Sequence, residues 1–524
     1  MRVVVVGHGM VGSRFVDELV SRLEDASVTV LGAEHHEPYN RVLLSELVAG
    51  RIGATSLTLP APANERVTVH RGVACVAVDR PGRTVTAADG RVLAYDVLVL
   101  ATGARARIPQ LPGLAPLPRG AHPLRSVDDA RAIVEAVRTS SRAVVLGAGV
   151  LGLEVACGLA GRGVEVTLAH GGPHLMDRQL DADAAQAVEH GLRRLGVAVR
   201  VGARPHAVVV SAGRVSGVLL PDGELLAADL LVLSAGTLPE TDLAARAELA
   251  VDRGIVVGPD GATSDPAVFA IGDCAQPPEG GTGLIAQGWD QARRLAAMLA
   301  DPEDRPSAAS HPGGTDVVRL KAHGLEVVTM GVGGSAATSG ATRRAVRLSD
   351  PTTGRHVEVV VAGGVVVGAT CVGAGTVAAD LTTAYTRRTP VPSDPAQLLL
   401  RPVRGAGAEV EPSVTLMPDR ATICRCNGVT KGEIAAGWAR GARTVEDVAR
   451  ATRATTGCGG CTDAVCGLIE WLARSAEPDV DPDADRDAHA REPAPPSTGT
   501  PARPDQAVSR LPMRTLQTSG PSSR

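Results

Sequence analysis

The feature that most constrains the fold is a glycine-rich motif, Gly-x-Gly-x-x-Gly, directly after a run of β-branched residues at the N-terminus. The run Val3–Val6 predicts a buried strand, and the amphipathic stretch Ser13–Leu23 after the motif predicts a helix. Gly7 permits a tight turn, Gly9 lets a phosphate approach the backbone, and Gly12 lets helix and strand pack closely. This order predicts a unit that binds the pyrophosphate of a dinucleotide at a helix N-terminus.

An acidic residue stands at the position where such a unit uses one. The next predicted strand, Val28–Leu31, is followed by Glu34, which comes about 20 residues after the last glycine of the motif. A carboxylate there accepts hydrogen bonds from ribose hydroxyls. The first quarter of the chain is therefore predicted to bind a dinucleotide.

The same pattern occurs a second time. A strand is predicted at Ala143–Leu146, a helix at Leu153–Leu159 and a further strand at Val164–Leu168. The glycines of this second motif are Gly147, Gly149 and Gly152. Two complete motifs predict two dinucleotide sites, and the alternative is one ligand site with one degenerate structural copy.

Three further strands indicate how the two units are connected. Val97–Leu100 leads into Ala101, Thr102 and Gly103, and Leu230–Leu233 leads into a similar turn that ends at Gly236. Val268–Ile271 then ends at Gly272 and Asp273, where a carboxylate could hold a polyhydroxyl chain. We predict an α/β fold in which the chain leaves one Rossmann-like domain, builds a second one and returns.

Composition excludes several classes of function. The 524 residues carry a net charge of -4 without a basic run, so we expect no nucleic-acid binding. No apolar run approaches the roughly 20 residues of a membrane span, and we expect neither a membrane segment nor a signal peptide. The chain has nine cysteines, an odd number, and four of them cluster near the C-terminus. This distribution favours a cytoplasmic protein with a metal site over a disulfide framework.

The clustered cysteines form two closely spaced pairs. Cys424 and Cys426 are followed, after 31 residues, by Cys458 and Cys461. The segment between them predicts two short helices with capping-box starts at Thr430 and Thr444, and a third helix follows the second pair. Four converging thiolates suit either Zn²⁺ or an iron–sulfur cluster, and the spacing alone leaves both open.

The two glycine motifs and the Gly-Asp strand resemble the two-dinucleotide-binding-domain flavoprotein reductases, relatives of glutathione reductase. The resemblance implies that the first motif, with Glu34 and Asp273, binds FAD. It implies that the second motif, with Glu154, binds NAD(P)H, and that Glu154 acts where the nicotinamide approaches the flavin. Further cofactor contacts are expected at Met10, Arg41, Ala101, Thr102, Gly103, Gly236, Gly272 and Gln287.

Three of these residues carry more specific expectations. Arg41 lies in the loop where disulfide reductases of this fold carry a redox cysteine, and we expect it to contact the flavin and act in catalysis; a solvated arginine is the alternative. Gln287 opens a helix whose N-terminus could stabilise negative charge on the flavin, or that is a plain domain helix. His170 follows the second strand of the second unit, where it could bind the 2′-phosphate of NADPH or tolerate NADH.

The cysteine segment resembles the bacterioferritin-associated-ferredoxin type of [2Fe-2S] module, through Thr456-Gly457-Cys458-Gly459-Gly460-Cys461. The stretches Pro38–Ser45, His174–Met176 and Gln179–Asp181 resemble the large subunits of NAD(P)H-dependent assimilatory nitrite reductases. They resemble equally the shorter electron-transfer subunits of assimilatory nitrate reductases. Because the paired cysteines of a sirohaem half are missing, we expect this chain to pass electrons to a catalytic partner rather than reduce nitrite itself.

The resemblance also implies a domain plan and leaves alternatives. A general NAD(P)H–ferredoxin or rubredoxin reductase has the same chemistry with another partner, and an iron-handling interaction protein is a minor alternative. A homo-oligomer is left open. The expected divisions are an FAD-binding domain (1–111 and 236–301), an NAD(P)H-binding domain (112–235), an interface domain (315–400), a linker (401–419), a [2Fe-2S] domain (420–475) and a disordered tail (476–524).

Overall fold

The computed structural model describes residues 1–60, 64–301, 316–333, 342–350, 352–399, 417–424, 427–457 and 459–476. The chain divides into two compact units, Met1–Leu472 and Ala473–Arg524. Every element below belongs to the first unit, apart from the last four residues of the final helix. None of the helices in the described part has the length and apolar content that crossing a bilayer requires.

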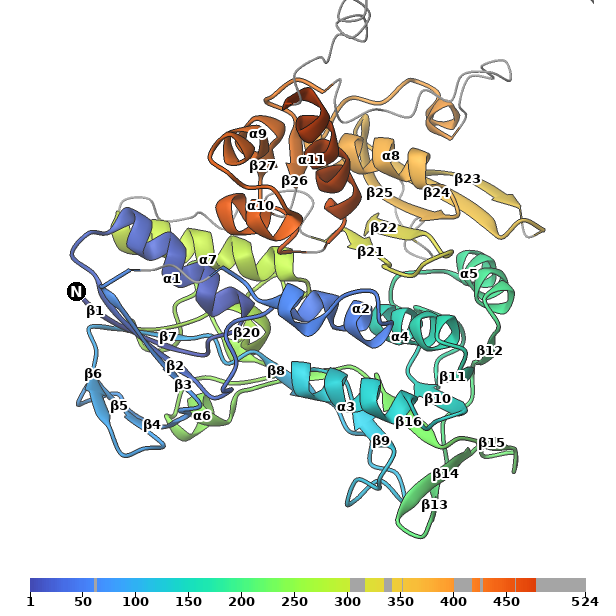
Figure 1. The fold of residues 1–524 in the computed structure, drawn as a ribbon, viewed down its shortest axis with the longest axis horizontal. Coiled ribbons are helices and arrows are strands. Elements are labelled where there is room, and N and C mark those ends of the chain that lie inside the picture. Colours follow the sequence, from blue (N-terminus) through green and yellow to red (C-terminus); the bar gives the residue numbers. More distant parts are fainter. Residues whose placement is uncertain are drawn as a thin grey trace, which may run out of the picture. The chain divides into compact units, whose positions relative to one another are not determined.

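The N-terminal sequence folds into a parallel five-stranded sheet (Figure 1). In spatial order its strands are β19 (Val268–Ala270), β7 (Val97–Leu100), β1 (Arg2–Val6), β2 (Ser27–Gly32) and β3 (Val67–Arg71). Val3 and Val5 enter the apolar core under helices α1 (Met10–Arg22) and α7 (Ile285–Ala300), while Val4 and Val6 enter the core on the opposite face. Burial on both faces explains why β1 is a continuous apolar run instead of an alternating one.

A second parallel sheet repeats this plan in the middle of the chain. In spatial order its strands are β12 (Val197–Arg200), β11 (Glu165–Ala169), β10 (Arg142–Leu146), β16 (Leu230–Leu233) and β9 (Ala121–Pro123). Its helices are α3 (Val127–Val137), α4 (Val150–Gly161) and α5 (Ala182–Arg194). Helix α2 (Leu44–Val48) reaches from the first part of the chain and packs against α3 and α4.

Two crossing segments join the sheets. Strand β8 (Ala104–Ala106) leaves the first sheet after β7, and β17 (Thr237–Pro239) returns after β16. The two pair antiparallel, so the outgoing and returning segments lie side by side. This confirms the predicted α/β fold with two Rossmann-like units, one inserted within the other.

Smaller elements decorate the two units. A three-stranded sheet follows β3, and a second one precedes β16. Their strands are β4 (Cys75–Asp79), β5 (Thr84–Ala87), β6 (Val92–Ala94), β13 (Ala207–Ser211), β14 (Arg214–Leu219) and β15 (Leu225–Ala227). The remaining short elements are η1 (Arg41–Leu43), η2 (Ala54–Leu57), α6 (Asp242–Arg246), β18 (Ile255–Val256), η3 (Gly272–Cys274) and β20 (Ala275–Gln276).

An antiparallel sheet covered by one helix follows α7 in the chain. In spatial order its strands are β21 (Val318–Arg319), β22 (Val327–Gly331), β25 (Val365–Val372), β24 (Arg355–Ala362) and β23 (Arg344–Asp350). Helix α8 (Gly375–Arg387) packs on β25, and η5 (Pro395–Leu398) follows it. Runs of valine predict strands at Val317–Leu320, Val357–Val361 and Val365–Ala369, and the structure has a strand at each place, with β24 and β25 longer than predicted.

The C-terminal cysteine segment is a small helical module. It contains β26 (Thr422–Cys424), β27 (Val429–Thr430), α9 (Lys431–Ala439), α10 (Val445–Thr452) and α11 (Thr462–Ala476). Both predicted capping boxes are formed, at Thr430 with Glu433 and at Thr444 with Asp447. The predicted linker up to residue 416 and the predicted tail from residue 477 lie outside the described residues.

Candidate functional site

The two glycine motifs adopt the same backbone geometry. Gly7 and Gly147 have φ angles of +114° and +110°, and a β-carbon at either would collide with a carbonyl oxygen, of Ala101 or Ser234 respectively. Each turn therefore requires glycine, because the strand next to it approaches too closely for any side chain. In both motifs the third glycine, Gly12 or Gly152, packs against the carbonyl of the first.

The middle glycines, in contrast, face open space. Gly9 and Gly149 cap helices α1 and α4 with extended backbone, and no side chain bonds the first helical N–H groups. The nearest atom to a β-carbon at Gly9 would be Arg41 Nε, at 3.9 Å, and none lies within 4 Å at Gly149. Both helix N-termini thus offer free N–H donors beside room for a phosphate, as FAD and NAD(P)H require.

A cavity of about 1450 Å³ opens at the first motif. It extends along the carboxyl ends of the first sheet to helix α4 of the second unit and to the antiparallel sheet. Of the predicted site residues, those that line it are Gly7, Gly9, Met10, Glu34, Arg41, Ala101, Thr102, Gly103, Glu154, Gly272 and Asp273. The structure therefore brings together residues from five separate stretches of the chain.

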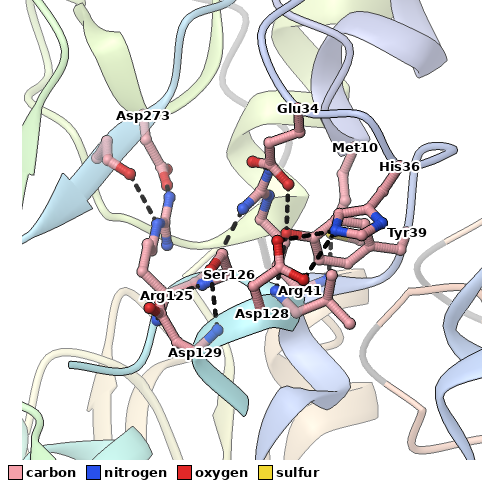
Figure 2. Close-up of polar contacts among 12 residues, drawn as sticks. Met10, Glu34, His36, Tyr39, Arg41, Arg125, Ser126, Asp128, Asp129 and Asp273 are labelled. Carbon is pink, nitrogen blue, oxygen red and sulfur yellow. Dashed lines mark hydrogen bonds and ion pairs between the residues drawn. The ribbon is translucent and has the colours of Figure 1, made fainter. Parts of the chain in front are cut away.

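Glu34 is held in place by two donors at one end of this cavity (Figure 2). Arg41 forms an ion pair with Oε1 at 2.5 Å, and the Tyr39 hydroxyl donates to Oε2 at 2.8 Å. The same hydroxyl accepts from the backbone N–H of Val127 at 3.0 Å, and burial raises the pKa of Tyr39. Arg41 lies beside the expected ribose carboxylate, which favours a binding role for it over a catalytic one.

The second carboxylate, Asp273, is paired with an arginine that sequence reasoning missed. Arg125 Nη2 lies 2.5 Å from Asp273 Oδ2, and Nε of the same guanidinium donates to the carbonyl of Ala104 at 2.8 Å (Figure 2). Arg125 lines the cavity just before the capping box of α3, Ser126 with Asp129. A guanidinium at this point suits a phosphate or a flavin oxygen.

Glu154 is buried and is the centre of an ion pair between distant segments. Its carboxylate accepts from Ser45 Oγ at 2.5 Å and from Lys321 Nζ at 2.6 Å, and also from the Lys321 backbone N–H. Lys321 is one of only two lysines in the chain, and it lines the cavity together with Glu154. Sequence reasoning assigned nothing to Lys321 because its partner lies far away in the chain.

His170 has a partner that bears on coenzyme choice. It follows β11, its Nδ1 accepts weakly from the Ala148 N–H at 3.4 Å, and its Nε2 lies 3.3 Å from Asp177 Oδ2. The segment after β11 therefore brings a carboxylate to the place where an adenosine ribose is expected. His170 does not line the large cavity around Gly7.

Several predicted contacts are not part of the cavity wall. The wall includes Gly283, Leu284, Ile285 and Ala286 at the start of α7, while the Gln287 side chain bonds the preceding turn at Gly280 and Thr282. The predicted helix N-terminus is thus beside the cavity, and Gln287 shapes the turn that leads to it. The other predicted residues outside this wall are Gly12, Gly147, Gly149, Gly152 and Gly236.

Two of the four predicted cluster ligands can be described. Cys424 and Cys461 are both buried, and a hydrogen bond between their thiols is the main cause that lowers the pKa of Cys424. Backbone N–H groups of Asn427 and Thr455 lower the pKa of Cys424 further. A thiol that is readily ionised is what a metal ligand requires, so this half of the site fits an iron–sulfur cluster. Cys426 and Cys458 lie outside the described residues.

None of the other described cysteines is part of the cavity wall, although Cys274 directly follows Asp273, which is. Cys75 is in β4, and Cys466 is in α11. Burial raises the pKa of Cys75 and of Cys157 to about 11. Among the described residues, no pair of cysteines is placed to act as a disulfide relay beside the cavity.

Comparison with known proteins identifies the fold family. The family described as pyridine nucleotide-disulphide oxidoreductase matches residues 1–294, and the BFD-like [2Fe-2S] binding domain matches residues 422–471. The chain belongs to the pyridine nucleotide-disulphide oxidoreductase family. It is an oxidoreductase with FAD, NAD(P)H and a [2Fe-2S] cluster as its cofactors.

Among curated relatives, a nitrite reductase [NAD(P)H] of Bacillus subtilis (strain 168) is 31% identical over 93% of this chain and 59% of its own length. The assimilatory nitrate reductase electron transfer subunit of the same organism is 29% identical over 90% of this chain and 60% of its own length. This chain thus spans less than two thirds of these relatives.

Among solved structures, a covalent putidaredoxin reductase–putidaredoxin complex matches with a TM-score of 0.68 and 28% identity. The match covers 76% of this chain and 95% of the matched chain.

Proposed function

We propose that the protein oxidises NAD(P)H in the cytoplasm and passes the electrons through FAD and a [2Fe-2S] cluster to the catalytic partner of an assimilatory nitrate or nitrite reductase. The observation that carries this proposal is the fusion, in one chain, of the two nucleotide units with a ferredoxin-type module. The similarity to nitrite and nitrate reductase subunits over about nine tenths of this chain supports the same partner class.

The described residues suggest how the first site would hold FAD. The N–H groups at the start of α1, beside Gly9, face the pyrophosphate, and Arg125 adds a positive charge to the same cavity. Glu34 would accept hydrogen bonds from the ribose, and Asp273, which follows β19, would accept them from the ribitol. The N-terminus of α7 is part of the cavity wall, and its dipole would stabilise negative charge on the reduced flavin.

The second site lies on helix α4. Its N-terminus at Gly149 would bind the pyrophosphate of NAD(P)H, and His170 with Asp177 would contact the adenosine end. Lys321 and Ser45 hold the carboxylate of Glu154, which lies one turn further along α4. This carboxylate would orient the nicotinamide where it meets the flavin. Bound FAD supplies the conversion between a two-electron hydride donor and a one-electron acceptor, and Cys424, Cys426, Cys458 and Cys461 hold that acceptor.

The domain plan predicted from the sequence remains our proposal. It assigns 1–111 and 236–301 to FAD, 112–235 to NAD(P)H, 315–400 to an interface domain and 420–475 to the cluster. Four apolar cores that each lie within one proposed domain support this division, whereas a fifth core joins residues of the three larger domains.

A second candidate is a general NAD(P)H–ferredoxin or rubredoxin reductase. It is favoured by relatives such as a rhodocoxin reductase of Rhodococcus erythropolis, 34% identical over 57% of this chain, and by the putidaredoxin reductase structure. The BFD-like [2Fe-2S] binding domain matched at residues 422–471 would give this chain its own one-electron carrier.

The test reconstitutes holoprotein, prepared without oxygen, with candidate nitrate or nitrite reductase catalytic subunits. We expect NAD(P)H-dependent formation of nitrite from nitrate, or of ammonium from nitrite, only when both components are present. A Cys461→Ser variant serves as the control, because it should keep FAD and lose the cluster. Equal turnover by this variant, or rapid reduction of free ferredoxin without any nitrogen oxide activity, would overturn the proposal.

A further inference from the structure

The loop between β2 and α2 contacts the cysteine module directly. Asn40 Nδ2 donates to the carbonyls of Thr456, at 2.8 Å, and Gly457, at 2.6 Å. These two residues immediately precede Cys458. Asn40 is 2% exposed, its bond to Gly457 is buried, and its bond to Thr456 is part-buried. A buried amide that loses its hydrogen-bond partners costs free energy, so the two bonds of Asn40 favour this one arrangement of the loop and the module.

The other cysteine loop contacts the helix that begins at the first glycine motif. Asn427, directly after Cys426, accepts from Arg14 Nη1 on α1 at 3.0 Å. The Asn427 amide also donates to the Arg453 carbonyl at 2.6 Å and lies 3.7 Å from Cys424 Sγ. Both cysteine loops are therefore anchored on the first nucleotide unit.

An ion pair joins the same surfaces. Arg453 pairs with Asp17 of α1, whose side chain is only 9% exposed. Burial, and Arg14 nearby, lower the pKa of Arg453 to about 10. Two arginines this close are compatible with a closed contact because Asp17 supplies a compensating negative charge.

The loop Tyr39–Leu43 contacts both the large cavity and the cysteine module. Tyr39, Arg41 and Val42 line the large cavity, whereas Asn40 is turned toward the module. Leu43 lies so close to Gly459 that a β-carbon at Gly459 would come within 2.8 Å of it. A single short loop thus contacts the proposed flavin cavity on one side and Gly457 and Gly459 on the other.

The module itself closes part of that cavity. Thr422, Asn427 and Gly428 contribute to the cavity wall. Asn427 Nδ2 lies 3.7 Å from Cys424 Sγ, so a proposed cluster ligand is close to a residue of the cavity wall. This proximity is what electron transfer needs, because its rate falls steeply with the separation of donor and acceptor.

We propose that the contact of Asn40 with Thr456 and Gly457, supported by the Asp17–Arg453 pair, is the internal docking site that positions the [2Fe-2S] module for electron transfer from the flavin. Asn40 is a positioning residue: it touches the loop that carries Cys458 and does not line the cavity. This inference rests on the proposed function, since it requires the flavin and cluster sites assigned above.

The decisive variant is Asn40→Asp. Asn40 Oδ1 also accepts from the Val42 N–H at 3.0 Å, and an aspartate keeps this local bond. It replaces the donor amide with an oxygen that faces two carbonyls, so only the docking contact turns repulsive. With anaerobic holoprotein, we expect normal FAD content and normal flavin bleaching by NADH, but cluster reduction slowed at least tenfold in stopped-flow spectra.

A readout independent of activity is hydrogen exchange. The amides around Leu43 and Gly459 should lose protection in Asn40→Asp, while those in β10 keep it. Asn64→Asp is the matched control, because Asn64 makes the same local bond to the Arg66 N–H and does not contact the module. Arg453→Met provides an independent way to weaken docking and should slow cluster reduction in the same direction.

The outcomes separate the inference from the function on which it rests. If wild-type cluster is not reduced by NAD(P)H, the proposed function fails. If wild-type cluster is reduced and both Asn40→Asp and Arg453→Met transfer electrons at the wild-type rate, the docking inference is wrong. The same holds if exchange increases but transfer is unchanged, because the contact would then be structural only.

Discussion

The two glycine-rich units share a backbone and differ in their side chains. Gly7 and Gly147 have nearly equal φ angles, and both α1 and α4 begin without a side-chain cap beside open space. At the end of the second strand, however, the first unit has Glu34 paired with an arginine, and the second has His170 beside a carboxylate. On the function proposed above, the shared backbone would bind each pyrophosphate, and the side chains would distinguish the two nucleotides.

A second difference concerns how each carboxylate is fixed. The Glu34–Arg41 pair is part exposed, with side chains 38% and 24% accessible. The Glu154–Lys321 pair is nearly enclosed, at 2% and 17%, and it joins α4 to a segment of the antiparallel sheet. Glu34 is thus paired with an arginine seven residues away in the chain, whereas Glu154 depends on a lysine from a distant segment.

Replacing the middle glycine of each motif by valine should have the largest effect, and the effect should differ between the two units. Both glycines have backbone angles open to any residue, and neither site has a protein atom in the way. Gly9→Val should fold but retain less than about a tenth of the wild-type flavin, because the side chain fills the space of the pyrophosphate. Gly149→Val should keep its flavin and raise the KM for NAD(P)H at least tenfold.

The measurement is the ratio of flavin to protein absorbance after gel filtration, followed by NADH titration. Gly161→Ala, at the far end of α4 and also in open space, is the control and should change neither quantity. If Gly149→Val loses FAD while Gly9→Val keeps it, the assignment of the two units is reversed.

Removal of the buried cation should cost more stability than removal of the exposed one. Lys321→Met leaves Glu154 charged and enclosed, which we expect to lower the free energy of unfolding by about 3 kcal/mol. Arg41→Met removes the partner of an accessible carboxylate and should cost about 0.5 kcal/mol. Urea midpoints measured by circular dichroism test this, and Glu154→Gln added to Lys321→Met should restore most of the loss. Equal costs would contradict the difference in burial.

The sequence predicted features that depend on near neighbours in the chain. The turn at Gly7, the capping box at Thr430 and the acid at Glu34 follow from local spacing, and the structure has each of them in a matching place. Local backbone sterics and hydrogen bonds decide these features, so a short window of residues contains the information.

Features that depend on distant neighbours were missed. Arg125 meets Asp273, Lys321 meets Glu154 and Asn40 meets Gly457 only because the fold joins separate stretches. Nothing in the residues around Arg125 or Lys321 distinguishes them from solvated cations. A hint existed for Lys321, since lysine is so rare in this chain that each one invites an explanation.

The smallest effect that we expect is on the preference of the second nucleotide unit for NADPH or NADH. Asp177 Oδ2 lies 3.3 Å from His170 Nε2, so its negative charge would repel the 2′-phosphate that distinguishes NADPH from NADH. Asp177→Asn should therefore raise kcat/KM for NADPH by about fivefold, as expected for partly exposed charges, and leave NADH unchanged. His170→Glu should act in the opposite direction, lowering kcat/KM for NADPH alone. Asp183→Asn, an exposed acid in the first turn of α5, is the matched control. The measurement is the steady-state rate with NADH and with NADPH. Changes of equal size for the two coenzymes would show that His170 and Asp177 do not contact the adenosine ribose. The end of β11 would then not distinguish the second nucleotide unit from the first.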